Sequence, residues 1–241
     1  KSKKVILENL DKIDPSLSSK EKENIIKKMW SNYGKTFIEY AHLKKLKSKT
    51  DHISIKNKYI IEDILNDKKP VIFISGHFAN YELMSMELRK ANIKLATIYR
   101  PLNNFFLNPF MEFLRRKYVC KNQIKKGIKG VRKAINYIRE NKSIALMIDQ
   151  RVSEGEKIFF FDKLALTTTL PAQLSTKFGI DIIPVYIERD KNDNFKIEFK
   201  KRISSKNFQN KVDLTRELNR VLEIMISKNP GQWIWTHNRW K

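Results

Sequence analysis

Short apolar runs alternate with amphipathic stretches along most of the chain, and this alternation predicts its strands and helices. Apolar runs bounded by polar or turn residues are typical of buried strands, and those that fit cover residues 71–74, 95–99, 143–148 and 182–187. Helices are expected over residues 80–90, 128–138, 171–178 and 213–228. Such an order predicts an α/β fold with a mostly parallel, mixed sheet and helices on both faces.

Two further segments have strand character. Residues 159–161 are expected to form a short strand, and residues 194–200 alternate apolar and polar positions as a half-exposed strand at a sheet edge does.

The first 60 residues are expected to be helical and polar-faced, with Ser18 and Glu21 forming a capping box and Gly34 interrupting the helix. No linker separates this part from the rest. We therefore expect one domain, made of an amino-terminal helical part at 1–66 and an α/β body at 67–241.

The charge balance narrows the class of partner. The chain has 241 residues, of which 41% are hydrophobic, so it can bury one substantial core. It carries 49 Lys and Arg against 26 Asp and Glu, a net charge of +23. An excess of this size favours a polyanionic environment such as nucleic acid, an anionic membrane surface, an acidic carrier protein or a phosphorylated substrate.

Cysteine and histidine usage argues against metal and disulfide chemistry. Cys120 is the one cysteine, which excludes an intrachain disulfide and is expected to be packed as a small apolar residue. The four histidines are dispersed, and we expect His42 and His52 to be solvated. We expect no metal site, and we find no apolar run near the roughly 18 residues that span a bilayer and no signal peptide.

The segment Ile72–Glu82 carries the most informative chemistry. His77 directly follows the first predicted strand and Ser75-Gly76, and Glu82 stands in the first turn of the next predicted helix. At about 100° per helical residue, two side chains five apart diverge, so they can meet only if His77 lies in the turn. A histidine base held by a carboxylate would activate a hydroxyl. The alternative is a turn histidine that caps the helix, with Glu82 favourable at its positive end.

Polar side chains also follow other predicted strands. Arg100 and Asp149, like His77, come at the carboxyl ends of apolar runs. The carboxyl ends of parallel strands share one edge of a sheet, where open α/β folds place their ligands. We therefore expect one shared cleft.

An ordered set of motifs resembles the late acyltransferases of lipid A biosynthesis, the lauroyl and myristoyl transferases of Gram-negative bacteria. The motifs are Gly76-His-Phe-Ala-Asn-Tyr-Glu82, Tyr99-Arg-Pro-Leu-Asn-Asn104, Asp149-Gln150, Phe160-Phe161, Thr167-Thr-Thr169, Ile183-Pro-Val185 and Gln232-Trp-Ile-Trp-Thr-His-Asn-Arg-Trp-Lys241. The resemblance covers about Ser18 to Lys241. This chain departs from the family at Ala79, Tyr81, Asp162 and Leu170, where the family usually has Gly, Trp, Gly and Gly.

The resemblance implies a glycerolipid-acyltransferase-like fold and transfer of an acyl group from acyl carrier protein to a hydroxyl of a lipid A precursor. It places the enzyme at the cytoplasmic face of the bacterial inner membrane, against an anionic surface. It implies no cofactor beyond acyl-acyl carrier protein as donor substrate. The family usually has an amino-terminal membrane segment, which we expect to be absent from this chain.

The family match also implies roles for individual residues. His77 and Glu82 are the expected catalytic pair, and Arg100 is expected to bind a phosphate or the developing oxyanion. Other expected substrate-binding or supporting residues are Asn80, Asn104, Asp149, Gln150 and Arg151. His237 is expected to be a structural partner among tryptophans that anchor the tail.

Alternatives remain open at two points. The same base mechanism would serve a glycerolipid or another glycolipid acyltransferase, and charge alone also suits a nucleic-acid-binding protein, although no binding module is recognisable. The aromatic-rich residues 105–114, followed by Arg115-Arg116-Lys117, suit either core packing or contact with a membrane. The basic residues from Lys121 to Lys133 suit a solvated face, a carrier-protein dock or lipid phosphates.

Overall fold

The computed structural model describes residues 2–49, 51–102 and 104–241; Asn103, part of the second motif, lies outside them. The main sheet has seven strands in the order β1-β9-β8-β2-β5-β3-β4. Its strands are β1 (Ile53–Lys56), β2 (Ile72–Ser75), β3 (Leu95–Tyr99), β4 (Asn122–Lys125), β5 (Ser143–Met147), β8 (Ile182–Arg189) and β9 (Phe195–Phe199). All neighbours are parallel except β8 and β9. The predicted mixed, mostly parallel sheet is confirmed.

Helices precede, connect and follow these strands. The α-helices are α1 (Ser2–Ile13), α2 (Ser19–Ala41), α3 (Leu43–Ser48), α4 (Tyr59–Asp67), α5 (Glu82–Lys90), α6 (Leu107–Leu114), α7 (Ile128–Arg139), α8 (Leu170–Phe178) and α9 (Lys211–Lys228). A π-helical turn η1 (Arg115–Val119) extends α6, and short 3-10 turns η2 (Ser205–Asn207) and η3 (Pro230–Gln232) flank α9. No described helix combines the length and apolar character that a membrane crossing needs.

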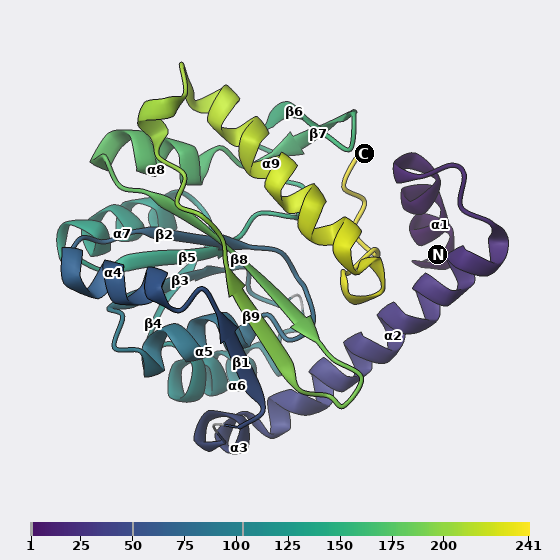
Figure 1. Ribbon diagram of the computed structural model, residues 1–241, viewed down its shortest axis with the longest axis horizontal. Coiled ribbons are helices and arrows are strands. Elements are labelled where there is room, and N and C mark those ends of the chain that lie inside the picture. The colour runs from purple at the N-terminus through teal and green to yellow at the C-terminus, as the bar shows by residue number, and fades with distance from the viewer. Residues whose placement is uncertain (1, 50, 103) are drawn as a thin grey trace.

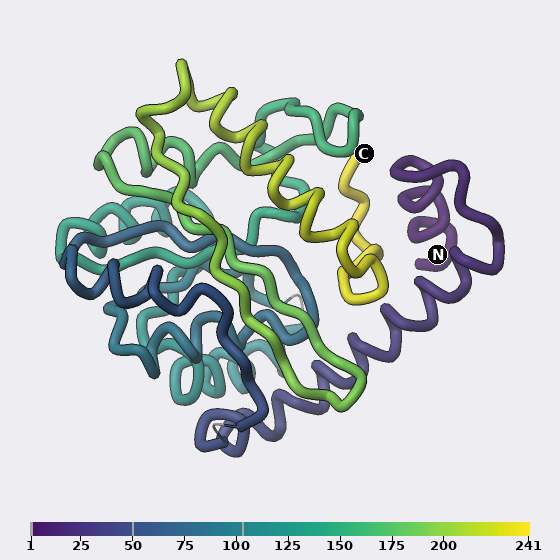
Figure 2. Tube along the Cα trace, in the orientation of Figure 1, coloured from purple at the N-terminus to yellow at the C-terminus, as the bar shows by residue number. Residues whose placement is uncertain are grey.

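The helices cover both faces of the sheet, as expected. Crossovers between parallel strands are right-handed, so connections that run in opposite directions along the sheet lie on opposite faces. The β2–α5–β3 crossover moves along the sheet toward the β4 edge, and the β4–α7–β5 crossover moves in the opposite direction, toward β2. Figure 1 accordingly shows α5 and α6 on one side of the sheet and α8 and α9 on the other. The trace in Figure 2 shows α1 beside the carboxyl-terminal tail.

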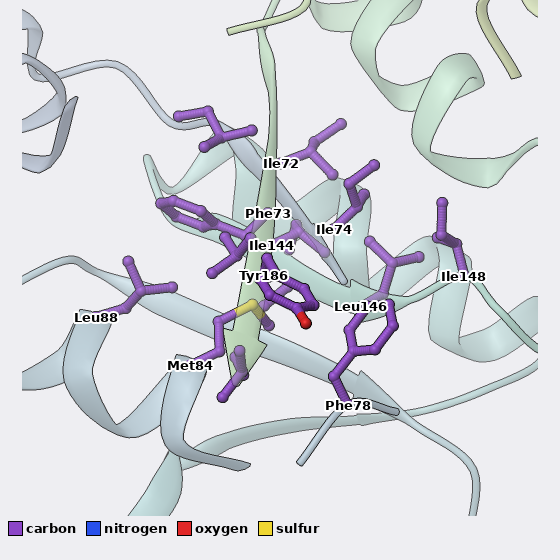
Figure 3. Packing of buried hydrophobic residues seen from close by; sticks show 14 of the residues in the cluster. Ile72, Phe73, Ile74, Phe78, Met84, Leu88, Ile144, Leu146, Ile148 and Tyr186 are labelled. Atoms are coloured by element: carbon purple, nitrogen blue, oxygen red, sulfur yellow. The ribbon is translucent and has the colours of Figure 1, made fainter. Parts of the chain in front are cut away.

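The core centres on β2, which is buried on both faces as interior strands of parallel sheets are. Ile72 and Ile74 face one way and Phe73 the other, and every residue of the strand is at most 2% exposed. Figure 3 shows Phe73 near Met84 and Leu88 of α5, with β5 alongside. The predicted apolar strands thus form one continuous core.

Three elements differ from the sequence expectation. β9 is not an edge strand, because β1 pairs along its outer side. β1 itself lies in the segment expected to be helical. Gly34 sits inside α2, which runs through it without a break.

The single strand expected near residues 159–161 is a hairpin of β6 (Glu156–Phe160) and β7 (Lys163–Thr167). Phe161 and Asp162 form its turn with φ of 49° and 54°, and Ala79 also has a positive φ of 43°. Asp162 and Ala79 thus hold the left-handed conformation that the family's glycines adopt most easily.

Candidate active site

The site lies where two adjacent parallel strands send their connections to opposite faces of the sheet. β2 and β5 are neighbours. The chain leaves β2 toward α5 and leaves β5, by way of the β6–β7 hairpin, toward α8. A crevice opens between diverging connections at the carboxyl ends of such strands. His77 follows β2 and Asp149 follows β5, so the topology brings both to this crevice.

His77 is held by Asp149 through both its ring and its backbone. The ring Nδ1 lies 2.8 Å from Oδ1 of Asp149, and the backbone N–H of His77 donates to Oδ2 at 2.8 Å. The indole N–H of Trp233 also donates to Oδ2, at 2.8 Å. Asp149 is buried, whereas part of the His77 ring faces the cavity.

These contacts determine the charge of Asp149 and the tautomer of His77. Burial raises the pKa of the carboxyl, but the His77 ring, its backbone N–H and the Trp233 indole together hold that pKa well below its ordinary value. An ionised carboxylate accepts a hydrogen bond from an Nδ1–H, and in that tautomer the lone pair of the ring is on Nε2. Nε2 is therefore the basic nitrogen.

The expected contact between His77 and Glu82 is wrong. Oε1 of Glu82 instead accepts from Nε of Arg115 at 2.7 Å and from the Tyr40 hydroxyl, and Nη2 of Arg115 donates to that hydroxyl at 2.9 Å. All three residues are buried. A buried guanidinium is costly without a counter-charge, and Glu82 on the first turn of α5 supplies one to Arg115. Glu82 still lines the cavity, but its carboxylate ties α5 to α2 and η1.

Two of the expected substrate-binding residues are buried structural groups. Asp149 is fully occupied by His77 and Trp233 and does not face substrate. Asn80 is 1% exposed, donates to Glu39 at 2.8 Å, and accepts from the backbone N–H of Glu82 at 3.2 Å. Both side chains use their hydrogen-bonding capacity inside the protein, so their contacts fit a supporting role rather than substrate binding.

Two other expected residues stabilise exposed loops. Oδ1 of Asn104 accepts from the N–H groups of Phe106 and Leu107, both at 3.0 Å, and so caps the start of α6. Arg151 donates to the backbone oxygen of Lys241 at 2.8 Å.

Gln150 and Arg100 do reach the cavity. The amide nitrogen of Gln150 lies 3.3 Å from Nε2 of His77 and 2.8 Å from Nε2 of His237. His237 is mostly buried, and burial, together with the nearby His77 and Arg100, lowers its pKa. Arg100 lines the mouth and is exposed. Of the three strand-end residues expected to share a cleft, His77 and Arg100 line the cavity, whereas Asp149 is buried behind His77.

The cavity has a volume of 530 Å³ and extends from the surface to the space between the sheet and α5. The Tyr81 ring packs edge-on against His77 with centroids 4.6 Å apart. The wall combines apolar side chains with polar groups, and its lining includes Met84, Ile98, Leu146, Met147 and Leu170 together with Thr97, Tyr99, Arg115, Lys126 and Thr168. A basic imidazole therefore faces a space large enough for part of a lipid.

Sequence reasoning missed Trp233 and Arg115 as partners in the site. For Trp233 the one signal was the family's tail motif, and for Arg115 there was none. Among the residues that the structure describes, no group of three His, Cys, Asp or Glu could hold a metal ion.

Comparison with known proteins agrees with the resemblance. A family model described as bacterial lipid A biosynthesis acyltransferase matches residues 1–241. Lipid A biosynthesis acyltransferase 2 of Shigella flexneri is 23% identical over 94% of this chain and 74% of its own length. Lipid A biosynthesis lauroyltransferase of Escherichia coli (strain K12) is 21% identical over 99% of this chain and 78% of its own.

A crystal structure of the 1-acyl-sn-glycerophosphate acyltransferase PlsC from Thermotoga maritima aligns with 97% of this chain and 96% of that one, at 12% identity and a TM-score of 0.46. Since the family model spans the sequence from its first residue to its last, the chain belongs to the bacterial lipid A biosynthesis acyltransferases, a family of O-acyltransferases.

Proposed function

We propose that this protein transfers a fatty acyl group from acyl carrier protein to a hydroxyl of a lipid A precursor, with His77 as general base and Asp149 as the residue that orients it. A hydroxyl is a poor nucleophile at neutral pH, whereas a thioester is already activated, so the base is the group that this reaction needs. The observation that carries the proposal is an imidazole ring that lines the cavity while an ionised, buried carboxylate holds its Nδ1.

The steps follow from that geometry. Nε2 of His77 takes the acceptor's hydroxyl proton as the oxygen attacks the thioester carbonyl. Asp149 stabilises the resulting imidazolium without itself becoming protonated. The tetrahedral intermediate collapses by breaking the carbon–sulfur bond, and the imidazolium returns its proton to the leaving thiolate. Arg100, at the mouth, is the proposed partner for the oxyanion or a substrate phosphate.

Charge supports the proposed partners and location. The net charge of +23 suits an acidic carrier protein, a phosphorylated glycolipid and the anionic cytoplasmic leaflet of the inner membrane. The mechanism requires no metal and no cofactor beyond the acyl-acyl carrier protein substrate.

The test is an acyl-transfer assay with labelled acyl-acyl carrier protein. We expect His77→Ala to lower turnover by about 10²–10⁴, the usual contribution of general-base catalysis, without loss of fold. His42→Ala, at an exposed histidine, is the matched control. Near-normal transfer by His77→Ala would refute the mechanism. Offering lipid A precursor, lysophospholipid and another glycolipid in parallel tests the acceptor, and preference for either of the latter would reassign it.

A further inference from the structure

The two most exposed large apolar side chains among the described residues lie in the loop before α6, and two further exposed phenylalanines follow on that helix. Phe106 and Phe105 are 90% and 83% exposed, and Phe110 and Phe113 are 54% and 55% exposed. With Leu102, which is also exposed, we call these residues the α6 patch.

Core packing does not explain the α6 patch. Phe106, Phe110 and Phe113 recur at helical spacing on one face of α6. Met111 and Leu114 supply the buried face of the same helix. Phe105 and Phe106 pack edge-on against each other, with centroids 5.8 Å apart. α6 therefore carries apolar side chains on its exposed face as well as on its buried face.

Exposed cations flank the α6 patch along the chain, and some of them contact α6 or share the cavity rim with Leu102. Exposed basic side chains near it in the chain are Arg100, Arg116, Lys117, Lys121, Lys125, Lys126 and Lys129. The ammonium of Lys117 lies 5.2 Å from the centroid of the Phe113 ring. Glu112, the acid on α6, is itself paired with Lys125 at 3.1 Å. Exposed aromatic rings among cations are the composition of surfaces that bind anionic lipid.

The patch reaches the rim of the active-site cavity. Leu102 belongs to both, and Arg100 and Lys126 line the cavity as well. A surface that contacts the α6 patch would therefore also lie at the mouth of the cavity.

We propose that the α6 patch inserts into an anionic lipid bilayer, with the phenylalanines among the acyl chains and the flanking cations at the head groups. The docked orientation places the cavity mouth at the membrane interface, where a lipid acceptor can enter without leaving the bilayer. This consequence for the acceptor rests on the proposed function, whereas bilayer binding by the patch does not.

An acidic carrier protein is the competing occupant of this surface. It would satisfy the cations but would have to bury nearly fully exposed phenylalanine rings as well. A bilayer accommodates the cations and the phenylalanine rings together, because anionic head groups lie directly above hydrocarbon at its interface.

The first test compares two double variants in binding to vesicles of phosphatidylethanolamine and phosphatidylglycerol. We expect Phe105→Ser with Phe106→Ser to weaken binding by about tenfold or more, since both rings lose their transfer into hydrocarbon. The matched control is Phe159→Ser with Leu164→Ser, an exposed cross-strand pair on the β6–β7 hairpin, which packs against α9 away from α6 (Figure 1). It should bind as the unmodified protein does.

The second test changes charge. Arg116→Glu with Lys117→Glu should weaken binding to the same vesicles by about tenfold or more, because each cation near an anionic surface contributes appreciably. The control is Lys201→Glu with Lys206→Glu, at exposed lysines far along the chain, which should weaken binding to these vesicles less. All variants should also bind neutral phosphatidylcholine vesicles weakly.

Activity separates this proposal from its rivals. The phenylalanine variant should lose transfer to acceptor embedded in vesicles but keep transfer to acceptor dispersed in detergent. Unchanged vesicle binding by both patch variants would overturn the proposal, and an accompanying rise in KM for acyl-acyl carrier protein would assign the surface to the carrier. If the unmodified protein binds vesicles through the patch but transfers no acyl group, the proposed function fails and the docking surface stands.

Discussion

At the scale of single residues, the two carboxylate oxygens of Asp149 differ in their hydrogen-bond donors. Oδ2 accepts from the His77 backbone N–H and from the Trp233 indole, and the His77 ring Nδ1 lies nearer to Oδ1, at 2.8 Å, than to Oδ2, at 3.0 Å. The oxygen with two N–H donors must remain an acceptor. Any change at the other position therefore acts directly on Nδ1 of the imidazole.

This division predicts the effect of Asp149→Asn. The asparagine should place its oxygen at the Oδ2 position and turn its NH₂ toward Nδ1, which forces the ring proton onto Nε2 and removes the base. We expect kcat to fall by up to about 10⁴, as for the same exchange in a serine-protease triad, with little change in KM. Steady-state kinetics would measure this, and circular dichroism would check the fold. A variant with full kcat would show that Asp149 does not set the tautomer.

At the scale of elements, Glu82, Arg115 and Tyr40 join α5, η1 and α2 behind the cavity. We expect Glu82→Gln to lower the free energy of unfolding by about 3–5 kcal/mol, because it leaves the Arg115 guanidinium buried without a counter-charge. Thermal denaturation should show a fall in Tm of about 10 °C. The pH dependence of kcat/KM should keep its shape, since Nδ1 of His77 is held by Asp149.

A paired variant separates the two possible roles of Glu82. Glu82→Leu with Arg115→Met removes both charges, and we expect it to recover most of the stability lost in Glu82→Gln. If instead Glu82→Gln retained its Tm and altered the pH profile, Glu82 would act on the imidazole after all.

The same cluster shows how far sequence patterns reach. Local apolar runs predicted β2, β3, β5 and β8, and the strand ends predicted a common cleft. Spacing within residues 77–82 could not predict that His77 pairs with Asp149, which follows the neighbouring strand β5, because that pairing depends on the order of strands in the sheet. β1 was missed because its alternation of apolar and polar residues covers only four positions, Ile53–Lys56, in a Lys-rich segment, so its pairing with β9 is what identifies it as a strand.

At the scale of the whole molecule, α1 and the carboxyl-terminal tail meet beside the site. Nδ2 of Asn9 on α1 donates to the backbone oxygens of Trp235 and His237, at 2.9 and 2.8 Å. Trp233 and Trp235 are each 1% exposed, so the expected anchoring of the tail by its tryptophans is confirmed. The helical part and the body therefore form one structure, and α1 helps to position His237.

This contact predicts a coupled effect of Asn9→Ala. Losing the amide leaves the backbone oxygen of Trp235 without its donor, whereas that of His237 keeps the Arg239 N–H, and we expect a loss of about 1–3 kcal/mol of stability. Turnover should fall as well, because Trp233 and His237 lie on the freed segment. Glu8→Ala, on the exposed side of the same helix, is the matched control. An unchanged Tm in Asn9→Ala would show that the hydrogen bonds from Asn9 to the carboxyl-terminal tail do not stabilise the fold.

The buried histidines make global stability depend on pH in a predictable direction. Burial lowers the pKa of His237, assisted by the neighbouring His77 and Arg100 and opposed by Asp149. Burial also lowers the pKa of His52, which is 4% exposed rather than solvated as expected. A histidine with a lowered folded-state pKa is protonated first in the unfolded chain, so its contribution to stability is complete above the unfolded value of about 6.5 and declines as the pH falls toward the folded value.

We therefore expect Tm to decrease between about pH 7 and pH 5, and His237→Gln to flatten part of that decrease. His42→Gln, at an exposed histidine, should leave the slope unchanged. The quantity to compare is the difference in Tm between each variant and the unmodified protein across this range, since His52 contributes equally to all of them. A slope in His237→Gln identical to that of the unmodified protein would mean that His237 takes up its proton as readily in the folded site as in the unfolded chain.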